Sequence, residues 1–206
     1  MLIAVGLTVP AGSALIDEEV YTELRASGQF GTMDLDVDEA EHSMELHMPY
    51  LMHVMGGHPF TLVPILVGAL PFESEAAYGE LLAPYLDDPT NLFIISSDFC
   101  HWGMRFSYTH YKQSVGAIYE SIEWLDRQGM AAIEAQDPGL FRDYLRSYGN
   151  TICGRHPIGV LLQALQRCRT KFKLQFTGYD QSSKCTKSTD SSVSYASAVV
   201  TVAGGS

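Results

Sequence analysis

Continuous apolar runs that alternate with helix-periodic segments constrain the fold of this chain most. Runs 61–67 and 91–97 have the pattern of strands covered on both faces in a parallel sheet. Segments 171–177 and 193–202 predict two further strands, and the first alternates polar and apolar residues as a less buried strand does. Apolar residues three and four positions apart predict six helices, over residues 17–27, 43–55, 74–86, 114–129, 138–148 and 157–169.

This alternation predicts an α/β fold, a mostly parallel sheet sandwiched by helices, with ligands bound at the carboxyl ends of the strands. Ser43 is a candidate helix cap, and Pro138 and Pro157 suit a first helical turn. No repeat or long linker interrupts the chain, so we expect one domain over residues 1–206.

The opening stretch, residues 1–16, resembles a secretion signal only in being apolar. No Lys or Arg precedes its apolar run, and the Pro-Ala-Gly at 10–12 interrupts it. It is also too short to cross a bilayer. We interpret it as a buried strand followed by a loop, and we expect no membrane insertion.

Charge and cysteine content narrow the classes of partner and compartment. A net charge of −11 repels phosphate backbones and argues against nucleic-acid binding. Residues 1–104 carry sixteen acidic side chains and one basic one, which is typical of either a docking surface or a solvated acidic flank. The four cysteines form no C-x-x-C pair, so we expect reduced thiols and a cytoplasmic location, with the nucleus left open as a second compartment.

The most informative motif is SSDFCHWG at residues 96–103. It follows a predicted buried strand, so Asp98 and His101 are expected in the loop where an α/β fold places its site. A carboxylate three residues before an imidazole can orient it, fix its tautomer or share a metal with it. The alternatives are that Asp98 caps the next turn and that Trp102 belongs to the core.

A second cluster, EHSMELH at residues 41–47, places His42 and Glu45 at the start of a predicted helix. The five-residue spacing between His42 and His47 excludes the zinc-binding H-E-x-x-H pattern. A capping and packing role is the alternative to a role in a pocket.

The third motif is NTICGRHPIG at residues 150–159. Cys153 stands just before a predicted helix, with Arg155 and His156 next to it, a setting that favours a thiolate able to bind a metal or act in redox chemistry. An inert buried cysteine is the alternative. The sequence contains no nucleophile elbow, P-loop or dinucleotide fingerprint.

Together these stretches resemble the Memo family (mediator of ErbB-driven cell motility). The resemblance is carried by residues 38–50, 64–70, 88–93, 96–103, 150–162 and 190–196, in that order and without gaps within each block. It implies an α/β fold similar to class III extradiol dioxygenases, with a pocket that binds copper or iron through two histidines and one cysteine.

The resemblance also implies roles for individual residues. Cys153 matches the metal-binding cysteine, and His101 and Asp98 match pocket residues, His101 at the position of the dioxygenases' catalytic histidine. Further pocket candidates are His42, Glu45, Cys100, Arg155 and His156. The family's His-Ala-Gly and Ser-His-His stretches, which supply the two metal histidines, do not occur in this sequence. The chain is therefore expected to lack the family's first strands and helices.

Three functions follow as hypotheses. The first is a Memo-like redox and signalling protein that binds copper or iron and phosphotyrosine segments of receptor or adaptor proteins, supports cell motility and lacks dioxygenase activity. The second is a metal-dependent oxidoreductase of the extradiol type, with His101 as general acid and base. The third is a metal-free peptide-binding adaptor, for which His101 and Arg105 are the natural phosphate donors.

Overall fold

The computed structural model describes residues 2–3, 8–9, 12–13, 15–34, 36 and 40–204. The chain divides into two compact units, residues 1–69 and 70–206. The prediction of a single domain stays a prediction. Among the described residues, no helix is both long enough and apolar enough to cross a membrane.

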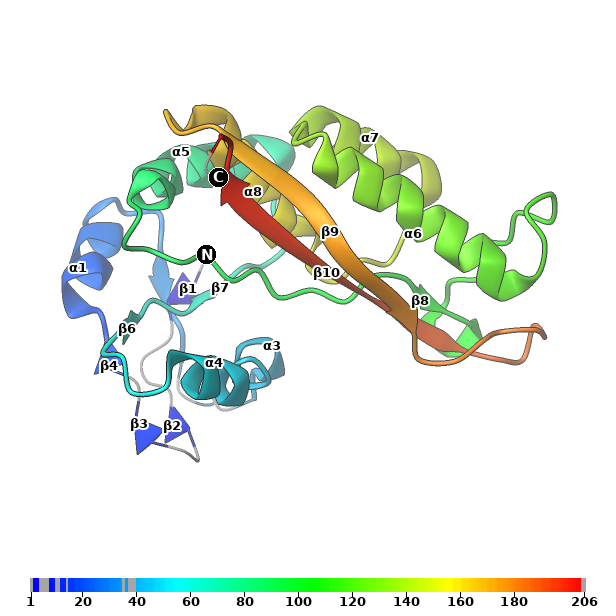
Figure 1. The fold of residues 1–206 in the computed structure, drawn as a ribbon, viewed down its shortest axis with the longest axis horizontal. Coiled ribbons are helices and arrows are strands. Elements are labelled where there is room, and N and C mark those ends of the chain that lie inside the picture. The colour runs from blue at the N-terminus through cyan, green and yellow to red at the C-terminus, as the bar shows by residue number, and fades with distance from the viewer. Residues whose placement is uncertain are drawn as a thin grey trace. The chain divides into compact units, whose positions relative to one another are not determined.

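The first unit is built from short strands and three described helices (Figure 1). Its strands are β1 Leu2–Ile3, β2 Thr8–Val9, β3 Gly12–Ser13, β4 Leu15–Ile16, β5 Gly31–Thr32, β6 Thr61–Leu62 and β7 Ile65–Leu66. Its helices are α1 Glu18–Ala26, α3 His42–Glu45 and α4 Met48–Met55. β1 pairs in parallel with β5 and antiparallel with β7, while β4 pairs in parallel with β6. Part of the predicted opening strand and loop lies outside the described residues.

The helix predicted over 43–55 divides in two. Glu41 caps α3, because its side chain accepts the Ser43 N–H at 2.6 Å, so the expectation that Ser43 is the cap is wrong. α4 begins at Met48, and Pro49 stands in its first turn. Proline has no N–H to donate and its ring would clash with the carbonyl four residues before it, which explains why one helix cannot continue through this point.

The second unit holds the longer elements. Its helices are α5 Phe72–Asp87, α6 Ile118–Glu134, α7 Pro138–Tyr148 and α8 Arg155–Arg167, and a 3-10 turn covers Met104–Phe106. Its strands are β8 His101–Trp102, β9 Phe172–Gln181 and β10 Ser192–Val202. β10 lies between β8 and β9 and pairs antiparallel with both. β9 and β10 form the long orange and red ribbon of Figure 1.

Local capping explains why α7 starts and ends where the sequence predicts. The Asp137 carboxylate accepts the N–H groups of Gly139 at 2.7 Å and Leu140 at 3.2 Å, and Pro138 occupies the first turn. Gly149 ends the helix in the left-handed conformation, at φ 59°.

The α/β class is confirmed, but the expected mostly parallel, helix-sandwiched sheet does not hold for the described strands. Four of their six pairings are antiparallel. At the start of β10, the buried residues Ser192 and Ser194 alternate with the half-buried Val193 and the exposed Tyr195. Such alternation is typical of an antiparallel sheet covered by helices on one face only.

Residues 91–97, predicted as a strand, form no strand and pair with none in the described part of the chain. Leu92 is 75% exposed and Ile94 is 48% exposed, so this run is not covered on both faces as its apolar sequence suggested. The pairing begins a few residues later, where the Phe99 N–H donates to Ser194 O at 2.8 Å and the Ser194 N–H donates to Cys100 O at 2.9 Å.

The core of the second unit lies between the helices and the inner face of β9 and β10. Its most deeply buried apolar members include Ile122 and Leu125 of α6, Leu162 of α8 and Ile152 in the loop before α8. This core includes Phe99, Cys100 and Trp102 from the first segment of the candidate site, residues 97–103, and Ile152 from the second segment, residues 150–156.

Candidate functional site

His101 is held by hydrogen bonds at both its backbone and its ring. β8 pairs His101 with Val193 of β10. The ring nitrogen Nδ1 lies 3.1 Å from Phe99 O and 3.2 Å from Thr151 O. Both partners are carbonyls, which only accept, so Nδ1 is a donor, and in the neutral form of such a ring Nε2 is an acceptor. Nε2 lies 3.7 Å from Asp98 Oδ2, an ion-pair distance when the ring is protonated.

Thr151 fixes the backbone of His101 from the second segment. The His101 N–H donates to Thr151 Oγ1 at 2.7 Å, and the same hydroxyl donates to His101 O at 3.1 Å. Together with the contact from Thr151 O to the ring, this residue makes three hydrogen bonds with His101, fifty positions away in the sequence.

Cys153 lies against the backbone of Asp98. The Asp98 N–H donates to Cys153 Sγ at 3.0 Å, and Ser97 Oγ accepts the Gly154 N–H at 2.9 Å. The Cys153 side chain is nevertheless exposed. The structure thus brings Asp98, His101 and Cys153 together, with an exposed thiol and an imidazole nitrogen available for chemistry.

Gly154 permits this close approach of the two segments. A Cβ at this position would clash with the Ser97 side chain and would lie 2.6 Å from Ser96 O. Because a backbone carbonyl cannot rotate away as a side chain can, glycine is required here for Cys153 to reach Asp98.

A buried carboxylate, Asp126, anchors the loop that carries Thr151 and Cys153. Its Oδ1 accepts from Asn150 Nδ2 at 2.9 Å and its Oδ2 accepts from the Tyr179 hydroxyl at 2.9 Å. Asn150 Oδ1 in turn accepts the Thr151 N–H at 2.7 Å. Burial raises the pKa of Asp126 above its ordinary value, although hydrogen bonds from Ser194, Asn150 and Tyr179 oppose this shift.

Arg105 provides an exposed positive charge three residues after the end of β8. Its guanidinium carbon lies 4.5 Å from the centroid of the Phe106 ring, and the same ring meets the His101 imidazole edge-on at 5.2 Å. Arg105, Phe106 and His101 therefore form a contiguous surface with cationic and aromatic character.

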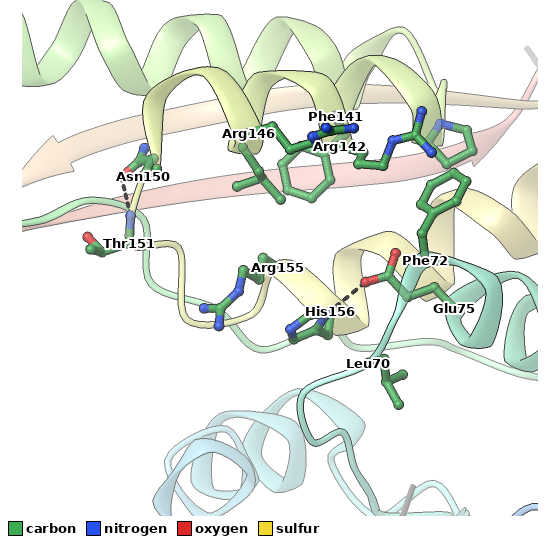
Figure 2. Close-up of a pocket in the computed structure, with 13 residues that line it drawn as sticks. Leu70, Phe72, Glu75, Phe141, Arg142, Arg146, Asn150, Thr151, Arg155 and His156 are labelled. Atoms are coloured by element: carbon green, nitrogen blue, oxygen red, sulfur yellow. Dashed lines mark hydrogen bonds and ion pairs between the residues drawn. The ribbon is translucent and has the colours of Figure 1, made fainter.

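A cavity of about 570 Å³ lies next to the second segment, within residues 70–206 (Figure 2). Arg155 and His156 of α8 line it together with Arg142 and Arg146 of α7. His156 Nδ1 lies 2.8 Å from Glu75 Oε1. Burial raises the pKa of Glu75, and the hydrogen bond from His156 opposes that shift.

The remaining predicted pocket residues lie elsewhere. His42 and Glu45 form an exposed pair in the first unit, with His42 Nδ1 at 2.9 Å from Glu45 Oε2. Cys100 is fully buried in the core of the second unit, and burial raises the pKa of its thiol. The structure places neither His42 nor Glu45 with the Asp98, His101 and Cys153 group, because it does not fix the two units relative to each other.

The described residues contain no group of three or more His, Cys, Asp or Glu side chains placed to hold a metal ion. Of the metal set that the family resemblance implies, this sequence contains Cys153. A soft thiolate suits copper or iron, but a single ligand does not make a site.

Sequence reasoning missed Thr151, Asp126, Arg142 and Arg146. Arg142 and Arg146 are four positions apart on a predicted helix, so their shared face could have been found from spacing alone. Thr151 and Asp126 carry no local signal, because their partners are far away in the sequence.

Comparison with known proteins shows extensive similarity to one family. The family model described as "Memo-like protein" matches residues 2–199. "Protein MEMO1" of Homo sapiens is 52% identical over 192 residues, which cover 91% of this chain and 65% of the relative. The protein of the same name from Danio rerio is 53% identical over 192 residues, with the same coverage.

A more distant relative, "Protein memo-1 homolog" of Caenorhabditis elegans, is 48% identical over 198 residues, or 94% of this chain and 57% of the relative. The chain thus spans somewhat less than two thirds of the length of these relatives. Because the family model matches almost the whole sequence and identity reaches about half of the aligned positions, the chain belongs to the Memo family.

Proposed function

We propose that this protein acts as a Memo-type redox and signalling protein that binds copper or iron and a phosphotyrosine segment of a receptor or adaptor, in support of cell motility. The observation that carries the proposal is the exposed Cys153 thiol, held at 3.0 Å by the Asp98 N–H in the same group as His101. A pocket of the extradiol-dioxygenase kind without dioxygenase activity, and a cytoplasmic or nuclear location, belong to the same proposal.

Cys153 is the metal ligand that this chain contributes. A backbone N–H aimed at sulfur stabilises a thiolate, the form that binds a metal. When bound, copper or iron would supply one-electron redox chemistry. The described residues provide no complete ligand set, so the proposal predicts weak retention that depends on this single residue.

The test is the metal content of purified protein, measured by elemental mass spectrometry after exposure to copper or iron. We expect bound metal in the wild-type chain and its loss in Cys153→Ala, whereas Cys168→Ala, which removes a buried thiol, keeps it. Metal content near zero in wild type and both variants would refute metal binding by this chain.

Phosphotyrosine binding is assigned to the surface of Arg105, Phe106 and His101. The Arg105 guanidinium can donate to phosphate oxygens, and the Phe106 ring beside it can pack on a tyrosine ring. If a phosphotyrosine peptide binds metal-free protein and Arg105→Ala weakens it about tenfold or more, the adaptor function gains support independently of metal. Equal affinity of the two proteins would argue against it.

An extradiol-type oxidoreductase is the second candidate, favoured by the two carbonyl oxygens beside Nδ1 of His101. Since Nδ1 is a donor to these carbonyls, Nε2 of the neutral ring can accept a proton as a general base. Oxygen uptake with a catechol, lost in His101→Ala, would support this activity over a purely signalling role.

A further inference from the structure

The cavity of residues 70–206 concentrates positive charge in a chain of net charge −11. Three of its lining residues are arginines, Arg142 and Arg146 from α7 and Arg155 from α8. Figure 2 shows the α7 residues on one side of the cavity and Arg155 and His156 on the other. Its volume of about 570 Å³ falls within the range of small-molecule sites, about 300–1,000 Å³.

These arginines are only partly neutralised by the described residues. Arg142 Nε lies 3.5 Å from Asp143 Oδ1, beyond a good hydrogen bond, and it is a buried donor without a hydrogen-bond partner among the described atoms. Arg155 donates to a backbone carbonyl, Ile152 O, at 3.3 Å. Arg146 makes no ion pair or hydrogen bond in the described structure.

The one carboxylate that lines the cavity is already paired. Glu75 accepts from His156 at 2.8 Å, and its side chain is 12% exposed. Its charge also acts on Arg155, but this single carboxylate faces three arginines, so the cavity keeps an excess of positive charge.

Apolar side chains complete the wall. Leu70, Phe72, Phe141 and Leu145 line the cavity, and the Arg142 guanidinium stacks on Phe72 with its central carbon 4.2 Å from the ring centroid. Stacking holds the plane of this guanidinium in place, which favours a directed, two-point contact with an oxyanion.

We propose that this cavity binds a small organic oxyanion, a phosphate or carboxylate group on a compact apolar body. The guanidinium groups of Arg142, Arg146 and Arg155 hold the oxyanion, and the phenylalanine and leucine side chains pack against the body. This site involves neither Arg105 nor Cys153, so it stands apart from the proposed metal and phosphotyrosine functions.

The test is calorimetric titration of the full chain with phenyl phosphate, benzoate and uncharged phenol at constant ionic strength. We expect phenyl phosphate and benzoate to bind and phenol not to bind. Arg146→Ala and Arg155→Ala should each weaken phenyl phosphate binding about tenfold or more, the usual effect of losing a charge-assisted hydrogen bond. Arg146→Lys should restore only part of the affinity, because lysine cannot donate in a fork.

Arg169→Ala is the matched control, because it removes an exposed arginine that does not line the cavity. Equal weakening by Arg169→Ala would reduce the effect to overall charge and overturn the site. Loss of binding in Arg105→Ala alone would assign the oxyanion to the Arg105 surface and also overturn it. Competition between a phosphotyrosine peptide and phenyl phosphate would show that the oxyanion bound in the cavity belongs to a peptide. Absence of competition would show that the cavity binds a free small molecule.

Discussion

At the residue scale, side chains of the same type differ sharply in how far they are exposed to solvent. The four cysteines illustrate this. Cys153 is exposed, while Cys100 and Cys185 are fully buried and Cys168 is 6% exposed. Burial raises the pKa of the Cys100 and Cys185 thiols, and that of Cys168 to about 11. Accessibility therefore favours reaction at Cys153, and the raised pKa values disfavour reaction at the three buried thiols.

We predict that one thiol per native chain reacts rapidly with a thiol-specific reagent. Cys153→Ser should abolish this fast phase, and Cys168→Ser should leave it unchanged. Spectrophotometric thiol counting and mass spectrometry of the labelled peptides measure both outcomes. Rapid labelling of Cys100 or Cys185 in the native protein would contradict the burial described here.

Asp126 predicts a pH dependence of stability. Because the folded pKa is raised above the ordinary value of 3.8, the folded protein holds this proton to higher pH than the unfolded chain does. Asp126 therefore stabilises the fold fully at pH values below its pKa in the unfolded chain. This contribution is lost as the pH rises through its pKa in the folded protein. Asp126→Asn keeps the shape of the side chain but removes the titration.

The measurement is urea unfolding of both proteins at a series of pH values from about 4 to 7. The free energy of unfolding of wild type minus that of Asp126→Asn should fall as the pH rises. Taking this difference cancels the other titrating groups, among them Glu75, whose pKa is also raised. A difference that grows with pH would mean that the ionised carboxylate stabilises the fold.

At the element scale, close approach of helices builds the second unit. α5 and α8 meet at Gly79, where an added Cβ would lie 2.8 Å from Ala164 N and 2.8 Å from Gln163 C, both backbone atoms. Glu75 lies on α5 and His156 on α8, so the distance between the two helices sets the geometry of the Glu75–His156 pair.

We expect Gly79→Ala to destabilise the protein. Overpacking costs about 1–3 kcal/mol, which outweighs the gain of up to about 1 kcal/mol from better helix propensity. Glu80→Ala, an exposed change on the same helix, should stay within about 0.5 kcal/mol of wild type. The measurement is the free energy of unfolding of wild type, Gly79→Ala and Glu80→Ala in denaturant. A Gly79→Ala variant more stable than wild type would show that α5 and α8 can move apart without cost.

The elements themselves were partly predictable. The helix predicted over 138–148 has those limits, because Asp137, Pro138 and Gly149 are local signals. The strands at 171–177 and 193–202 are confirmed, with β9 extending to Gln181. The prediction of a strand at 91–97 was wrong. An apolar sequence indicates that a segment tends to be buried, but it does not indicate which strands are available to pair with it.

At the scale of the whole molecule, the two units differ in how much apolar surface they bury. In the described part of the first unit, the buried apolar residues are Tyr21, Leu24, Phe30, Met33 and Met48. The second unit contains a continuous core that spans α6, α7, α8 and the β9–β10 ribbon. Local opening should therefore cost less free energy in the first unit.

Hydrogen exchange measured by mass spectrometry tests this difference. Peptides from α6 and α8 should exchange more slowly than peptides from α4, by roughly tenfold or more. Peptides that cover Asn91, Leu92 and Ile94, which are exposed and belong to no strand, serve as an internal fast reference. Equal protection of α4 and α6 would show that the two units open together.

The sequence by itself determined the α/β class, most helix positions and the motifs that carry Asp98, His101 and Cys153. These follow from contacts within about four residues, such as caps and helical spacing, or from a motif read as a whole. The tertiary structure decided that Thr151 binds His101, that the Asp98 N–H meets Cys153 across 55 positions, and that three arginines line one cavity. Such contacts depend on the path of the chain between distant residues, which local hydrogen bonding and periodicity do not specify.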